Sequence, residues 1–156
     1  NGSQSSVHAA MYGIILAKQL SLNMKAVFVV DSAAVKFLTN SRVFTSSERD
    51  SYLTDLDSDG QKYLSYISDL AKTKGLKIET EMRSGAVWAE VIRAAEEFKA
   101  DMILLGGGSK AKVSYVQDNE YRHNIQTTAR TEIVTYANCP VLVVHKEQVE
   151  DLFKIL

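Results

Sequence analysis

Cysteine and proline are scarce in this sequence, which contains one of each among 156 residues. A single cysteine, Cys139, cannot form an internal disulfide bond, which excludes a small disulfide-stabilised fold and favours a reducing compartment. No apolar run approaches the roughly 20 residues that cross a bilayer, and the first residues do not resemble a signal peptide. We therefore expect a cytoplasmic protein without a membrane partner.

The sequence also lacks a strong charge of either sign. Its formal net charge of −1 provides no long-range attraction to nucleic acid, so we expect no nucleic-acid partner. Hydrophobic residues make up 46% and charged residues 24%, a composition that allows a packed core. Because single domains usually contain about 100–200 residues, one globular domain is expected.

Helical and strand patterns alternate along the chain. Apolar residues recur at three- and four-residue steps in four segments, Val7–Leu20, Glu48–Thr73, Ala86–Lys99 and Asn124–Ala137. Short apolar or alternating runs predict four strands, Lys25–Asp31, Leu76–Met82, Met102–Leu105 and Val141–Val144. Ser5 or Ser6 could cap the first helix. Ser32–Ser47 and Lys110–His123 are expected to be long connections, while Gln148–Leu156 is ambiguous between helix and strand.

This alternation predicts an α/β fold in which crossover helices join parallel strands. Such sheets bind ligands beyond the carboxyl ends of their strands. The glycines Gly106–Gly108 follow directly after the strand predicted at Met102–Leu105. They either form a phosphate cradle or simply make a turn out of a buried strand, and both interpretations stay open.

Two other motifs are incomplete. Asp55–Gly60 matches the first half of a calcium-binding loop, but the position that requires a bidentate glutamate is Tyr66. Leu56 and Tyr63 instead continue a helical stripe through this segment. Gly106–Ala111 satisfies a loose dinucleotide fingerprint, but neither the helix nor the acidic residue that should follow is present.

Catalytic and metal-binding patterns are weak. The three histidines, His8, His123 and His145, are widely separated, and Cys139 precedes Pro140 at the entry to a strand. No nucleophile is paired with a base in the sequence, and no zinc-ligand spacing occurs. We therefore predict a protein that is not an enzyme and has no metal site.

Three segments resemble the universal stress protein family. Asn1-Gly2-Ser3 and a helix ending Leu16-Ala17-Lys18 resemble the family's Asp-Gly-Ser turn and first helix. Gly85–Gly106 is similar to its pattern of glycine, amphipathic helix, Ala-Asp, apolar strand and glycine. Ala137–Val144 is similar to its Ala-Pro-Cys-Pro-Val-Leu-Val-Val ending. The resemblance implies a domain over residues 1–145, followed by a tail over residues 146–156.

For the fold, the resemblance implies three α/β/α layers around a mainly parallel five-stranded sheet with the order 3-2-1-4-5. The first, central strand of that sheet is absent from the start of this chain, which begins at the turn that follows it. Upstream residues could supply it. Alternatively Leu152–Leu156, which resembles the family's opening strand, could enter the slot, and a short surface helix is the rival interpretation of the tail.

For function, the resemblance implies a stress-response regulator that binds ATP or another adenine nucleotide. The nucleotide-binding residues that it implies are Asn1, Gly2, Val29, Val30, Asp31, Gly106, Gly107, Gly108, Ser109, Thr127 and Thr128. The family's phosphate-binding loop matches outright only at Gly106, while Thr128 keeps a hydroxyl group. Ser109 and Thr127 stand where the pattern has glycine, and Asn1 stands where it has aspartate.

The resemblance leaves room for other functions. One alternative is a dimeric interaction module of the same fold that binds no nucleotide, and a third choice is an ATP hydrolase or nucleotidyl transferase. The apolar strand Val141, Leu142, Val143 and Val144 is an edge strand in the family's topology. Because an exposed apolar edge tends to be covered by pairing, we expect a homodimer through this strand.

Overall fold

The computed structural model describes residues 2–41, 45–107, 129–145 and 149–155. Its elements are α1 (Gln4–Leu20), β1 (Lys25–Val30), α2 (Ser32–Asn40), α3 (Ser46–Thr73), β2 (Glu79–Ser84), α4 (Val87–Phe98), β3 (Ile103–Gly106), β4 (Val141–Val144) and α6 (Val149–Ile155). Residues 129–136 are also helical. The predicted loop Lys110–His123 lies outside the described residues.

The described strands form two parallel pairs. In the first pair β1 lies beside β2, with Lys25 opposite Glu79 and Val30 opposite Ser84. In the second β3 lies beside β4, with Ile103 opposite Val141. The α/β class and the parallel pairing are therefore confirmed, whereas the order of a five-stranded sheet stays a prediction, since the described ranges contain two separate two-stranded sheets.

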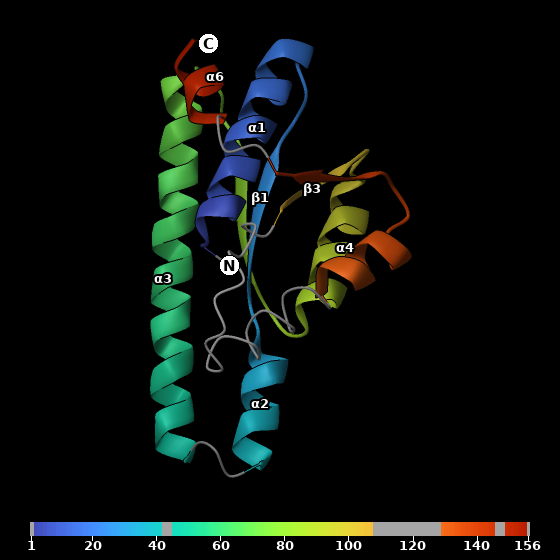
Figure 1. Cartoon of the computed structure of the whole chain (residues 1–156). Helices are drawn as coiled ribbons and strands as arrows, with labels where there is room; N and C mark the ends of the chain where they lie inside the picture. Colours follow the sequence, from blue (N-terminus) through green and yellow to red (C-terminus); the bar gives the residue numbers. More distant parts are fainter. Residues whose placement is uncertain (1, 42–44, 108–128, 146–148, 156) are drawn as a thin grey trace, which may run out of the picture.

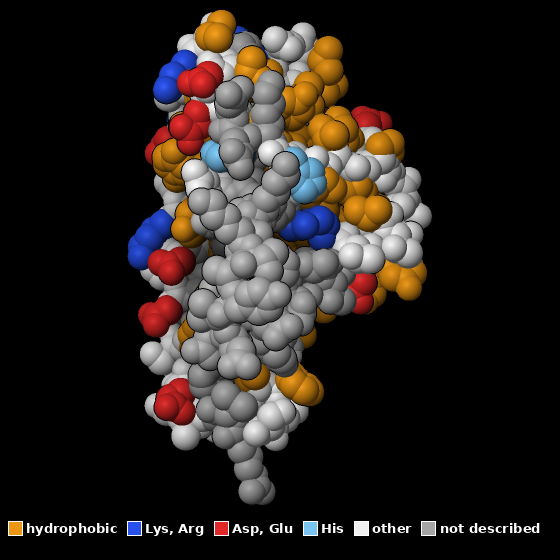
Figure 2. Space-filling view, viewed as in Figure 1, with side chains coloured by type: hydrophobic (Ala, Val, Ile, Leu, Met, Phe, Trp, Pro, Cys, Tyr) orange, Lys and Arg blue, Asp and Glu red, His pale blue; other side chains and the backbone are white. Residues whose placement is uncertain are grey.

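Helices cover the strands from two sides. Helices α1 and α3 lie together on one side, and α4 lies on the other beside the helical residues 129–136 (Figure 1). Helix α3 begins with a capping box, in which Thr45 and Glu48 satisfy each other's backbone amides. Its acidic residues follow the outer edge of the molecule (Figure 2). Asp55–Gly60 lies within this helix, so the helical interpretation of that segment is confirmed.

Gly60 has a packing role in α3. A Cβ atom on Gly60 would come within 2.6 Å of Cδ1 of Phe28 on β1 and 2.8 Å of the Met82 side chain on β2. A glycine in the middle of a helix costs roughly 1 kcal/mol relative to alanine. Here it lets α3 approach the first strand pair more closely than any other residue allows.

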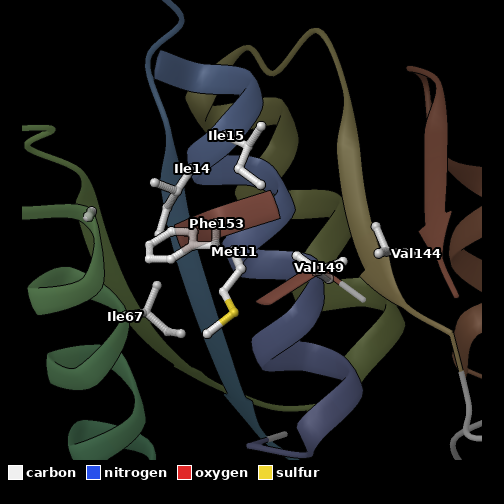
Figure 3. Close-up of a cluster of buried hydrophobic side chains, with 9 residues drawn as sticks. Met11, Ile14, Ile15, Ile67, Val144, Val149 and Phe153 are labelled. Atoms are coloured by element: carbon white, nitrogen blue, oxygen red, sulfur yellow. The ribbon is translucent and has the colours of Figure 1, made fainter. Parts of the chain in front are cut away.

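The main core cluster joins the first and last helices of the described chain. Met11 and Ile14 of α1 and Ile67 of α3 surround Phe153 of α6, while Val144 of β4 lies across α1 from them (Figure 3). Val149 of α6 is fully buried. The tail is thus a core helix, and the prediction that Leu152–Leu156 could be a displaced strand is wrong.

Two sequence expectations are corrected by local contacts. Ser32–Ser47 is not one long connection, because Asp31 caps α2 by accepting a hydrogen bond from the Ala34 amide. The strand predicted at Leu76–Met82 begins three residues later. The amide of Leu76 still bonds to Ala71 at the end of α3, so the ladder with β1 starts only at Glu79.

Candidate functional site

The carboxyl end of β3 lies against the amino-terminal end of α1. A Cβ atom on Gly106 would lie 2.5 Å from the carbonyl carbon of Ser5 and 2.8 Å from the amide nitrogen of Ser6. Only glycine allows this approach of helix backbone to strand backbone. Gly106 therefore has a structural reason to be glycine that is independent of any ligand.

Serine hydroxyls surround the start of α1. Ser3 is the capping residue, in place of the predicted Ser5 or Ser6, and its Oγ accepts a hydrogen bond from the Ser6 amide at 3.3 Å. The Oγ atoms of Ser5 and Ser6 each lie 3.0 Å from that of Ser3. No acidic residue occupies the first turn of this 17-residue helix. The positive end of the helix dipole is therefore not neutralised from within the turn.

Gly107 is covered by a histidine. Its amide donates a hydrogen bond of 2.7 Å to the carbonyl of Val144, which extends the pairing of β3 with β4 by one residue. His145 follows β4, and its imidazole lies so close to Gly107 that any side chain at that position would collide with the ring. Gly107 is buried and His145 is exposed. An imidazole ring thus lies at the carboxyl edge.

On the other side of α1, Gly2 lies against an aromatic pair. It adopts a positive φ of 63°, and a side chain there would collide with the ring of Tyr63 on α3. Tyr63 stacks on Phe28 of β1, with ring centroids 6.2 Å apart and planes 9° apart. Tyr63 keeps 38% of its surface exposed. This end of the site offers a partly open aromatic surface.

The end of β1 contributes less than the resemblance implied. Val29 and Val30 are buried, so their side chains face the interior. One carboxylate oxygen of Asp31 is engaged by the Ala34 amide at the start of α2. A ligand at this end would have to use backbone groups or the second carboxylate oxygen of Asp31.

The structure brings part of the predicted site together. Gly2 directly precedes Ser3, the cap of α1, while Gly106 contacts the first turn of α1 and Gly107 follows directly. The other predicted residues Asn1, Gly108, Ser109, Thr127 and Thr128 lie outside the described residues. Sequence reasoning missed Ser5, Tyr63 and His145. His145 could have been found, because a polar residue after a parallel strand lies at the ligand-binding edge, whereas Tyr63 is brought there only by tertiary packing.

The predicted dimer residues form β4 with the expected bounds. Val144 is buried in the core, whereas Leu142 keeps 36% of its surface exposed. The carbonyls of Pro140 and Val144 accept hydrogen bonds from the amides of Ile103 and Gly107. Because backbone groups alternate along a strand, those of Val141 and Val143 face the outer edge.

Metal and membrane features are absent from the described part of the chain. Across its four ranges, no group of three or more histidine, cysteine, aspartate or glutamate side chains is arranged to hold a metal ion. In the same ranges, every helix is too short or too polar to span a bilayer.

Comparison with known proteins gives one consistent result. Residues 1–145 match the universal stress protein family. The chain is 31% identical over 150 residues to universal stress protein MJ0531 of Methanocaldococcus jannaschii, which covers 96% of this chain and 81% of that protein.

Solved structures share the fold at low sequence identity. A universal stress protein in complex with cAMP has a TM-score of 0.62 and 18% identity, covering 93% of this chain and 90% of its own. Universal stress protein UspA of Lactobacillus plantarum has a TM-score of 0.65 and 18% identity, and the match covers 93% of this chain and 92% of that protein. The protein MJ0577 has a TM-score of 0.63 and 15% identity, and the match covers 94% of this chain and 92% of that protein. These similarities establish the fold.

Proposed function

Because the chain belongs to the universal stress protein family, we propose that it is a regulatory protein that binds an adenine nucleotide. The ligand lies across the start of α1, with its base toward Gly2 and Tyr63 and its phosphates toward Gly106 and Gly107. One solved structure with the same fold was determined in complex with cAMP, which is itself an adenine nucleotide.

The start of α1 is the observation that carries this proposal. Its first turn contains serine hydroxyls and no acidic side chain, and its backbone touches Gly106 at the carboxyl end of β3. Helix amino termini attract phosphate because their amides and dipole present positive potential. The tight packing around Gly106 supports a preorganised turn, since the position of the helix start is fixed relative to the strand.

Isothermal titration with ATP, ADP, cAMP and adenosine tests the proposal. We expect the wild-type protein to bind at least one of the phosphorylated ligands. Gly106→Ala should weaken that binding at least tenfold, because the new methyl group pushes the Ser5 backbone away from β3. Ser5→Ala, which leaves the Ser3 cap intact, should weaken it by only a few-fold.

Gly75→Asn is the matched control for a glycine replacement. Gly75 follows α3 with a positive φ of 74°, which asparagine tolerates, and nothing lies within 4 Å of a Cβ atom there. This variant should bind as the wild type does. The proposal fails if the wild type binds none of the four ligands, or if Gly106→Ala binds as tightly as the wild type. Phosphate release from ATP should stay at background, in keeping with binding without turnover.

The proposal includes a homodimer that forms through β4. The outer backbone groups of Val141 and Val143 have no strand partner within the described ranges, and the half-exposed Leu142 makes this edge apolar. Unpaired apolar edges are prone to pairing with another chain. A second copy of β4 would satisfy the same groups on both subunits about a twofold axis.

We also propose that the two strand pairs are parts of one five-stranded sheet. Its order, 3-2-1-4-5, counts the additional central strand as the first, so in the present labels the strands lie in the order β2, β1, additional strand, β3, β4. The amides of Val27 and Val29 on β1 face away from β2, and those of Leu104 and Gly106 on β3 face away from β4. Buried backbone groups are nearly always paired. A fifth strand between β1 and β3 would pair both edges.

A further inference from the structure

His145 occupies a place that the proposed function does not yet use. It is the first residue after β4, and its ring lies over the backbone of Gly107. Gly107 is joined to the same strand end through the bond from its amide to Val144. The ring contact with Gly107, and the bond from Gly107 to the neighbouring Val144, therefore place the imidazole beside the carboxyl end of β3.

Contacts along the carboxyl edge give a consistent order of chemical groups. Tyr63 touches Gly2, Ser5 touches Gly106, and Gly107 touches His145. An aromatic surface thus lies at one end of the row, serine hydroxyls and helix amides lie in the middle, and an imidazole lies at the other end. The order suits a ligand with a flat apolar base at one end and anionic oxygens at the other.

We infer that His145 binds the terminal phosphate of the nucleotide and makes the site prefer phosphorylated ligands over nucleosides. This inference rests on the proposed function. An imidazole N–H donates to phosphate oxygens, and the interaction strengthens when the ring carries a proton because the hydrogen bond becomes charge-assisted. His145 is exposed, so its ring can contact a ligand without any rearrangement of the core.

The ratio of the adenosine and ATP dissociation constants measures this preference. In His145→Ala the ratio should fall roughly tenfold relative to the wild type, because one hydrogen bond to phosphate is lost. The adenosine constant itself should stay unchanged, since the base lies at the opposite end. His145→Lys should restore much of the ratio, because an ammonium group also donates to phosphate.

His8→Gln provides the matched control. The Nε2 atom of His8 lies 3.3 Å from the Glu150 carboxylate, so this imidazole is directed toward α6. Its replacement should leave the adenosine-to-ATP ratio unchanged. Imidazole nitrogen chemical shifts give a second readout, since ATP but not adenosine should shift the His145 signals and neither ligand should shift those of His8.

The outcomes separate the two proposals. If the wild type binds no adenine ligand, the proposed function fails and the role of His145 fails with it. If the wild type binds ATP but His145→Ala keeps the full ratio, or loses adenosine and ATP binding equally, only the role of His145 is overturned. A His145 imidazole signal unaffected by saturating ATP would overturn it as well.

Discussion

At the scale of single residues, the densest charge in the described chain surrounds Arg83 on β2. Only 9% of the Arg83 side chain is exposed. Its guanidinium group pairs with Glu81 at 2.6 Å, with Glu90 at 3.6 Å and with Glu97. Lys25 of β1 pairs with Glu81 at 3.1 Å and lies over the Phe98 ring. These residues tie β1, β2 and α4 together.

The position of Glu81 between two cations lowers its pKa below the ordinary value of 4.5. The hydrogen bond from Lys25 is the main cause, partial burial opposes it, and the hydrogen bond from Arg83 adds to the lowering. A carboxyl group whose folded pKa is depressed stabilises the fold above its unfolded pKa. That contribution is lost as the pH falls through the lower folded value.

Glu81→Gln should therefore lower the melting temperature at neutral pH, and the difference from the wild type should close as the pH falls below 4.5. Thermal melts recorded between neutral pH and about pH 3 measure both effects. Asp101→Asn removes an exposed carboxylate outside the cluster and should show a smaller difference at neutral pH. A Glu81→Gln difference that stays constant down to the lowest pH contradicts the assignment.

At the scale of elements, the sequence predicted well those segments whose pattern is strong over their own length. The bounds of β4 were predicted to the residue, and α4 and β3 to within a residue at each end. Helix α2 was missed because serine and threonine suggested a loop, whereas the Asp31 cap and the burial of Val35 determine its structure. Seven residues are too few for a pattern to identify α6, since its helix depends on packing against α1.

The same limit applies to the candidate site. The glycines after β3 could be recognised from the sequence, because glycine marks close approach of the backbone. In the structure, the backbone of α1 comes close to Gly106 and the ring of His145 comes close to Gly107. Which partner comes close is a property of the folded chain, and no local pattern around residue 106 contains it.

Strand β4 provides the test of the homodimer. Val143→Pro removes an outward-facing amide and leaves the ladder with β3 intact, because that ladder uses the alternate residues. We expect this variant to dissociate into monomers at concentrations where the wild type is dimeric, as measured by light scattering. Val143→Ala keeps the amide and should stay dimeric. A wild type that is monomeric at micromolar concentration, or a Val143→Pro dimer of unchanged stability, defeats the proposal.

At the scale of the whole molecule, the proposed five-stranded sheet requires one further strand between β1 and β3. The test supplies such a strand in trans, as a peptide with the sequence of β1, Lys-Ala-Val-Phe-Val-Val. We expect hydrogen exchange at the amides of Val27, Val29 and Leu104 to slow at least tenfold, because each gains a carbonyl partner. Exchange at Val141, on the outer edge of β4, is the internal control. Inner-edge amides that exchange rapidly both in the chain alone and with the peptide present contradict the five-stranded sheet.

The packing of α6 against α1 also affects the order in which the protein can fold during its synthesis. Domains generally fold as units, and during synthesis the amino-terminal parts of a chain are available first. Helix α1 is formed early, yet Met11 and Ile14 meet Val149 and Phe153 of α6 only after more than a hundred further residues have been added. Throughout that interval α1 has only the covering that α3 and the strands can provide. Part of the apolar face of α1 therefore becomes covered only when α6 has been synthesised.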